Sequence, residues 1–202
     1  MAPREPAYRR LAVDERRRRL LELGARLFSR HTYAELSMSA IAREAGISKA
    51  LLYHYFPSKQ AFFAATLRQQ AEELAARTAT DPSQPPAEQL VHALDAFLAW
   101  VEENAAGYAK LLEGAGTHTE VRELVEQVRS VTADRILAGL SPDAAPAPAL
   151  RAAVHGWLWF MDGAITDWLE HRDIARDQLR GLLLGTLYGA ITAAGERPAA
   201  LS

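Results

Sequence analysis

Apolar residues recur every three or four positions along nearly the whole chain, and almost no segment alternates apolar and polar residues with a period of two. A period near 3.6 places apolar side chains on one face of a helix, whereas a strand with one buried face needs strict alternation. The sequence therefore predicts an all-α protein. Two proline-rich stretches, at 80–86 and 141–149, interrupt the pattern and predict loops, because proline removes an amide donor and fixes a backbone dihedral angle.

The helices that we expect are bounded by these breaks and by capping residues. Ser58 is an N-cap candidate after Pro57, and Thr117 with Glu120 has the capping-box pattern. The expected segments are 14–29, 38–45, 48–53, 58–79, a helix through Leu90–Val101, a brief helix at 107–112, a helix that follows Thr117, and two long apolar helices at 150–170 and 174–194. The helix after Thr117 has an expected apolar stripe of Val121, Leu124, Val125, Val128 and Val131.

Charge is distributed unevenly along the chain. Residues 1–60 hold 12 Lys and Arg against 6 Asp and Glu, a balance of +6, and the remaining 11 against 19 give −8, which together make the net charge of −2. A basic segment joined to an acidic remainder indicates that the first sixty residues meet a polyanion. The run Arg16–Arg19 has two interpretations, a solvated helix face or a set of phosphate contacts.

Several classes of protein are disfavoured by what the sequence lacks. The absence of cysteine excludes disulfides, thiol catalysis and cysteine-ligated zinc. There is no glycine-rich phosphate loop, no Gly-x-Ser-x-Gly elbow and no His-Glu-x-x-His motif, so we do not expect an enzyme. Asp167 and His171 have the spacing of a metal-binding pair but no third ligand, and we expect an ion pair there, with no metal or cofactor.

The sequence also gives no indication of a membrane. The segment "MAPREPAYRR" is charged and broken by proline, which is unlike a signal peptide. The longest nearly apolar run, Leu182–Gly195, is too short to span a bilayer. We therefore expect a cytoplasmic protein without membrane partners.

The stretch "GISKALLYHYFPSK", residues 46–59, has the pattern of a helix-turn-helix. This motif needs a small residue where its two helices cross, a residue in the turn that tolerates positive φ, and an apolar residue that ties the turn to the core. Ala42, Gly46 and Ile47 supply these in order. The start of the second helix, residues 48–51, then lies exposed, and in this motif that end enters the major groove of DNA.

The side chains in this stretch suit DNA. Ser48 and Lys49 offer donors to base edges or phosphates, and Leu51 can lie against a thymine methyl group. Tyr53, His54 and Lys59 carry donors for phosphates on either side of the groove. His54 is equally suited to cap the end of its helix, and Tyr55 and Phe56 are expected in the core rather than at the contact.

The run "SMSAIAREAGISKALLYHYFPSKQAFF", with "LLELGARLF" before it, resembles the DNA-binding domain of the tetracycline-repressor (TetR) family of transcription regulators over about residues 14–66. The resemblance implies about nine helices, with a DNA-binding domain at residues 1–57 and a helical ligand-binding and dimerisation domain at 58–202, connected by the helix at 58–79. Two departures are Ala50–Leu51, where the family usually has Gly then Thr or Ser, and Thr32 before Tyr33, where it commonly has Gly. The matching DNA-contact positions are Ser37, Ser39, Ser48, Lys49, Ala50, Leu51, Tyr53, His54 and Lys59.

The last helix carries a small residue at every fourth position, namely Gly181, Gly185, Gly189 and Ala193. Such a stripe allows another helix to approach closely. In the resembled family the last two helices pair with those of a second copy in a four-helix bundle. We therefore expect a twofold homodimer through these helices, which reads a palindromic operator with its two DNA-binding domains about 34–36 Å apart.

Regulation by a small molecule requires a pocket, and the helices between residues 86 and 170 hold enough aromatic and polar side chains to line one. Trp159 and Asp162 are singled out because helical spacing places them away from the stripe of Trp157, Met161 and Ile165. The alternative for most of the aromatic residues is the core. The candidate ligand-binding residues are Trp100, Tyr108, His118, His155, Trp159 and Asp162.

These features together favour a ligand-responsive DNA-binding transcriptional regulator. The resemblance favours a repressor that releases its operator when a small-molecule effector binds, through a two-state movement of the helix at 58–79. The alternatives are a helical protein-interaction module that does not bind DNA and, less favoured, an enzyme with a site that no motif reveals.

Overall fold

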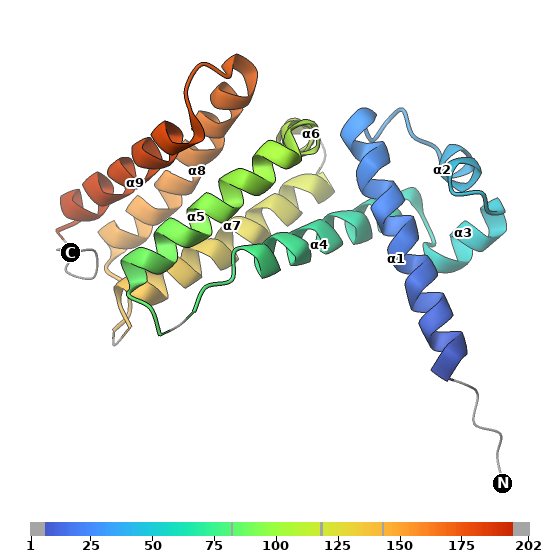
Figure 1. Ribbon diagram of the computed structural model, residues 1–202, viewed down its shortest axis with the longest axis horizontal. Helices are drawn as coiled ribbons and strands as arrows, with labels where there is room; N and C mark the ends of the chain where they lie inside the picture. The colour runs from blue at the N-terminus through green and yellow to red at the C-terminus, as the bar shows by residue number, and fades with distance from the viewer. Residues whose placement is uncertain (1–6, 82, 118, 143, 196–202) are drawn as a thin grey trace, which may run out of the picture. The chain divides into compact units, whose positions relative to one another are not determined.

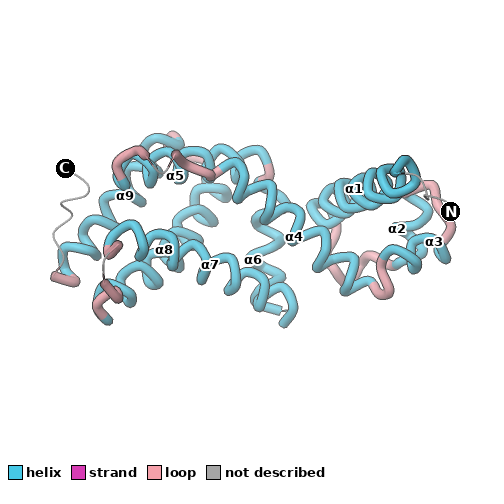
Figure 2. The backbone as a smooth tube through the Cα atoms, turned by 90° about the horizontal axis from the view of Figure 1, so that it is seen from below, coloured by secondary structure: helices cyan, strands magenta, loops and turns pink. Residues whose placement is uncertain are grey.

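The computed structural model describes residues 7–81, 83–117, 119–142 and 144–195, and every regular element in these ranges is an α-helix (Figures 1 and 2). This confirms the all-α prediction. The helices are α1 (Ala7–Arg30), α2 (Met38–Glu44), α3 (Lys49–Tyr55), α4 (Lys59–Arg77), α5 (Pro86–Glu103), α6 (Ala105–Thr117), α7 (Thr119–Leu140), α8 (Pro148–His171) and α9 (Arg176–Ala193).

Two helices are longer than the sequence pattern predicts. Helix α1 begins at Ala7 instead of residue 14, because alanine, arginine and leucine favour helix and extend it back toward Pro6. Helix α6 covers Ala105–Thr117 instead of 107–112, so its glycines do not interrupt it.

Proline is the first residue of both α5 and α8, where its missing amide costs no hydrogen bond. The predicted capping box of Thr117 and Glu120 lies outside the described side chains.

The chain forms two compact units. The first, here called the head, is the chain up to Glu72 together with Ala106–Arg122, and the second, the body, is Glu73–Ala105 together with Glu123 onward. The division falls after Glu72, within α4, the helix that the sequence analysis expected to connect the two domains. The reason is that the first half of α4 contributes Phe62, Phe63 and Thr66 to the buried interior of the head.

An aromatic cluster forms much of the core of the head. The rings of Phe28 and Phe63 meet edge to face at 4.5 Å between centroids, and those of Phe56 and Phe62 do so at 4.9 Å. Helix α1 approaches α4 closely at Gly24, where an added Cβ would lie 2.5 Å from Thr66 Oγ1 and 2.8 Å from Phe62 Cζ. The glycine therefore sets the spacing of these two helices.

Helices α8 and α9 lie side by side and supply most of the core of the body (Figure 1). The indole Nε1 of Trp157 donates a hydrogen bond of 2.8 Å to the carbonyl of Leu183, which ties the two helices together inside the core. Arg180 on α9 pairs with Asp95 on α5 at 2.7 Å. The buried residues of the pair are Leu150, Val154, Trp157, Leu158, Met161, Ile165, Trp168, Leu179, Leu183, Leu187 and Ile191.

The apolar stripe of α7 differs from the one expected. Val128 and Val131 are 37% and 63% exposed, so the expectation that they belong to the stripe was wrong. The buried positions are instead spaced by four, with Val125, Ala133 and Leu137 in the core. Arg129 occupies the position between Val125 and Ala133 on this face, and its side chain is only 12% exposed.

Large apolar side chains and glycines are exposed on α8 and α9. Trp159, Phe160 and Leu182 are 59%, 42% and 48% exposed. Gly181, Gly185 and Gly189 lie exposed on α9, and a Cβ built on any of them would meet no atom within 4 Å. Across the described residues, no helix is long and apolar enough to cross a membrane.

Candidate nucleic-acid interface

Helices α2 and α3 are joined by a tight turn at Gly46. This glycine has φ of +64°, a conformation that side chains with a Cβ adopt only at a cost. The amide of Ile47 donates to the carbonyl of Ala42 at 3.0 Å, and that of Gly46 donates to Arg43 at 3.1 Å. The turn predicted from residues 42, 46 and 47 is therefore present, and it directs α3 away from α2.

Two serines begin the two helices of this unit. The hydroxyl oxygen of Ser37 accepts the amide of Ala40, and that of Ser48 accepts the amide of Leu51, each at 3.1 Å. Each serine thus caps its helix while its hydroxyl proton remains available to an external acceptor. Both side chains are exposed, as is that of Ser39. The caps fix the position of these hydroxyl groups at the starts of α2 and α3.

The start of α3 is open on the head. Lys49 and Ala50 are exposed and Leu51 is half-buried, while Leu52, on the opposite side of the helix, is completely buried with Ile41 of α2. Tyr53 and His54 are also exposed, and the ammonium group of Lys49 lies 5.8 Å from the centroid of the Tyr53 ring. The expected contact residues 48–51, 53 and 54 therefore form a continuous, accessible surface with donors along it.

Phe56 is buried and Tyr55 is half-buried, so Phe56 belongs to the core as expected. Lys59 was expected as a phosphate ligand, and this role stays a prediction. Its Nζ donates to the carbonyls of Tyr33 and Leu36, both at 2.9 Å, and lies 4.2 Å from the centroid of the Tyr33 ring. Two of the three N–H donors of this half-buried cation are thus used within the head.

The turn between α1 and α2, where Thr32 replaces the usual glycine of the resembled family, needs no left-handed backbone. Arg172 is the one residue other than glycine with positive φ in the described ranges, so Thr32 adopts an ordinary conformation. The amide of Thr32 donates to the carboxylate of Glu35 at 2.7 Å, and this hydrogen bond lowers the pKa of Glu35 below its ordinary value. The carboxylate thus closes the turn that leads to Ser37.

The candidate ligand-binding residues with described side chains fall into two groups by burial. Trp100 is buried on α5, and Tyr108 on α6 is buried within the head. His155 and Trp159 instead lie exposed on α8. His118 lies outside the described residues. A role for this set in ligand binding stays a prediction.

Trp159 and Asp162 are brought together by Arg129, a residue that the sequence analysis did not single out. The guanidinium lies 3.8 Å from the centroid of the Trp159 ring, and its Nε and Nη2 both donate to Asp162 Oδ2. The charge of Asp162 is therefore matched within the protein. A cation at the centre of an otherwise apolar stripe on α7 is the sequence signal that could have revealed this pair, because buried charges require partners.

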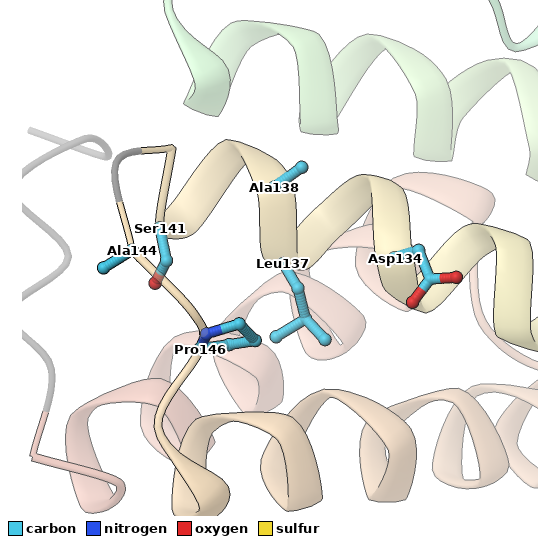
Figure 3. A pocket seen from close by; sticks show the side chains of 6 residues that line it. All are labelled: Asp134, Leu137, Ala138, Ser141, Ala144 and Pro146. Carbon is cyan, nitrogen blue, oxygen red and sulfur yellow. The ribbon is translucent and has the colours of Figure 1, made fainter.

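A shallow hollow lies where α7 ends and the connection to α8 begins (Figure 3). The residues that line it are Asp134, Leu137, Ala138, Ser141, Ala144 and Pro146. None of the candidate ligand-binding residues is among them. Near the end of α8, His171 Nδ1 lies 3.4 Å from Asp167 Oδ1, which is an ion pair when the imidazole is protonated.

Two helices that cross at a tight turn, with an exposed, donor-bearing start of the second helix, define a helix-turn-helix DNA-binding protein. Comparison with known sequences agrees with this class. Residues 20–66 match the family described as "Bacterial regulatory proteins, tetR family". Residues 86–189, which are more than half of the chain, match "Tetracyclin repressor-like, C-terminal domain". The chain belongs to the TetR family of transcriptional regulators.

Individual relatives support the same family. A solved tetR-family regulator from Streptomyces coelicolor is 30% identical, with a TM-score of 0.77 over 90% of this chain and 82% of that one. The transcriptional activator FasR of Mycolicibacterium smegmatis is 36% identical over 110 residues, 52% of this chain and 48% of that protein. The repressor KstR of Rhodococcus jostii is 33% identical over 79 residues, 39% of this chain and 37% of that protein. The chain thus spans about half or less of the length of these two curated relatives.

Proposed function

We propose that this protein binds double-stranded operator DNA through α2 and α3, represses the adjacent genes, and releases the DNA when a small molecule binds to the body. The observation that carries the proposal is the capped and accessible start of α3, where Ser48 and Lys49 present donors while Leu52 fixes the helix to the core. The site residues are those of the exposed surface, Ser37, Ser39, Ser48, Lys49, Ala50, Leu51, Tyr53 and His54. Such a protein acts where the chromosome is, in the cytoplasm.

The exposed surface of α8 and α9 is proposed as the homodimer interface. It combines the large apolar side chains of Phe160 and Leu182 with a stripe of glycines that a second helix could approach. Large exposed apolar groups on a helix pair are typical of a surface that binds a partner. A twofold dimer places two heads on the two halves of a palindromic operator.

The effector is proposed to bind in the body, among side chains of α5, α7 and α8. A solved regulator from Saccharomonospora viridis, 20% identical with a TM-score of 0.69, is described in complex with choline, so a protein of this fold can hold a small molecule. Relatives named as an activator and as a repressor both occur. We propose repression because it is typical of the family, and we propose α4, which contributes residues to both head and body, as the helix that responds to the effector.

DNA binding is tested with a duplex that carries the region flanking the gene for this protein, and with a scrambled duplex of equal length. We expect preferential binding to the first duplex and a steep loss of affinity as salt rises, since phosphate contacts release counterions. Binding that favours neither duplex and changes little with salt would reject the proposal. The same result would favour a protein-interaction module.

Variants on the exposed surface of α3 extend this test. Lys49→Ala is expected to weaken binding, and it assigns Lys49 to phosphate if both duplexes are affected equally or to a base if preference at one position relaxes. Tyr53→Phe removes one hydroxyl group and keeps the ring beside Lys49. This variant therefore tests the proposed hydrogen bond from the Tyr53 hydroxyl to DNA while the aromatic ring is retained.

A further inference from the structure

Three arginines of the run Arg16–Arg19, namely Arg17, Arg18 and Arg19, differ in their partners. Arg18 donates to Glu15 at 2.7 Å and to Glu22 at 3.0 Å, and Arg19 donates to Glu15 at 2.9 Å. Both cations are thus neutralised by carboxylates of their own helix. Pairs of this kind on an exposed helix face reduce the field that an external anion experiences.

Arg17 has a different environment. It precedes the buried Leu20 and Leu21 by three and four residues, so it lies on the side of α1 that faces the core of the head. Its side chain is exposed, and no described carboxylate forms an ion pair with it. Its guanidinium carbon lies 5.5 Å from the centroid of the Phe56 ring.

Phe56 places the guanidinium group of Arg17 near the C-terminal end of α3. It is the C-cap residue of α3, is only 2% exposed, and packs edge to face on Phe62 at 4.9 Å. The exposed Tyr53 and His54 lie within the last turn of the same helix. An arginine held against an aromatic ring keeps its planar N–H groups available at the edge, an arrangement suited to a phosphate.

We propose that Arg17 binds a phosphate of the DNA backbone beside the groove that α3 enters, whereas Arg18 and Arg19 do not. The inference rests on the proposed function, since it assigns a further contact to the same DNA-binding surface. It makes α1 a third element of that surface, next to α2 and α3. Because a phosphate contact carries no base preference, Arg17 would contribute equally to all DNA sequences.

The test compares Arg17→Met with Arg18→Met. Both changes remove one positive charge and retain an unbranched apolar stem, so long-range attraction to DNA falls equally in both variants. Fluorescence anisotropy with the flanking duplex and with the scrambled duplex, from 50 to 300 mM salt, gives the slope of log K against log salt. For Arg17→Met we expect this negative slope to become shallower by about 0.9 per protomer, and the affinity to fall about tenfold on both duplexes. Arg18→Met is expected to keep the wild-type slope.

Thermal unfolding of the same variants separates a phosphate contact from a packing role. If the stack of Arg17 on Phe56 only stabilises the head, Arg17→Met lowers the melting temperature and keeps the wild-type slope, which would overturn the inference. Equal slopes for Arg17→Met, Arg18→Met and the wild type would overturn it as well. If the wild-type protein binds neither duplex, both the proposed function and this inference are rejected. If the wild type binds with a steep salt dependence and Arg17→Met binds in the same way, only this inference is rejected.

Discussion

Lys59 illustrates how a residue in a recognised motif can have a structural role. As the first residue of α4, it donates to two carbonyls in the turn that leads to Ser37, 26 and 23 residues earlier in the chain. These carbonyls need a donor because the turn leaves them without helical partners. Lys59 therefore fixes the start of α2 relative to the start of α4 within the head.

Substitution of this lysine distinguishes the two roles. Lys59→Met is expected to lower the stability of the head by about 1–2 kcal/mol, since two hydrogen bonds from a charged donor are lost. DNA affinity should fall with the salt slope unchanged. Lys49→Met is the matched control, and it should reduce affinity while leaving the melting temperature near that of the wild type, because Lys49 is exposed. A reduced slope with an unchanged melting temperature in Lys59→Met would assign Lys59 to phosphate instead.

Glu35 gives the same turn a pH dependence. The amide of Thr32, as its hydrogen-bond donor, lowers the pKa of the carboxyl group in the folded state. A lowered folded-state pKa means that the ionised group stabilises the fold at neutral pH, and that this contribution is lost as pH falls below the ordinary value of the group. Glu35→Gln should therefore lower the melting temperature at pH 7 and approach the wild type as pH falls through the lowered folded-state pKa of Glu35. A difference that grew toward acid pH would contradict this assignment.

At the scale of elements, the contact of α1 with α4 depends on Gly24. The nearest atom to an added Cβ is Thr66 Oγ1, and this hydroxyl is itself bonded to the carbonyl of Phe62 at 3.0 Å. Gly24→Ala should destabilise the protein by about 1–3 kcal/mol, because the two helices must separate or Phe62 must leave its place in the cluster.

A glycine in open surroundings provides the control for this change. Gly139 on α7 has no atom within 4 Å of a built Cβ, so Gly139→Ala should be neutral or stabilising by up to about 1 kcal/mol. Urea unfolding of both variants measures the difference. Equal midpoints for the two variants would show that α1 and α4 can separate without cost.

The elements also show which features local sequence can predict. The turn at Gly46 and the caps at Ser37 and Ser48 were predictable, because each depends on residues within five positions of one another. The partners of Lys59 are more than 20 residues away, and Arg129 pairs with Asp162 across 33 residues, so no local pattern reveals them. The error in the stripe of α7 has the same origin, since Val128 and Val131 fit a helical period but lie on its exposed side.

At the scale of the whole molecule, the proposed dimer predicts which exposed apolar residues matter. Leu182 on α9 and Val131 on α7 are both large and exposed, but only Leu182 lies on the face of α8 and α9. Leu182→Glu should yield a monomer at micromolar concentration and lose tight operator binding, since a single head makes half of the contacts. Val131→Glu should remain dimeric. Sedimentation equilibrium measures both, and a monomeric wild type would contradict the proposed interface.

The four tryptophans of the chain differ sharply in their access to water. Trp100, Trp157 and Trp168 are 8%, 5% and 3% exposed, whereas Trp159 is 59% exposed. Acrylamide should therefore quench chiefly the emission of Trp159, whose intensity then reports on the outer side of α8 without any added label. Quenching that weakens as the protein concentration rises would show that association of two copies shields Trp159 from acrylamide.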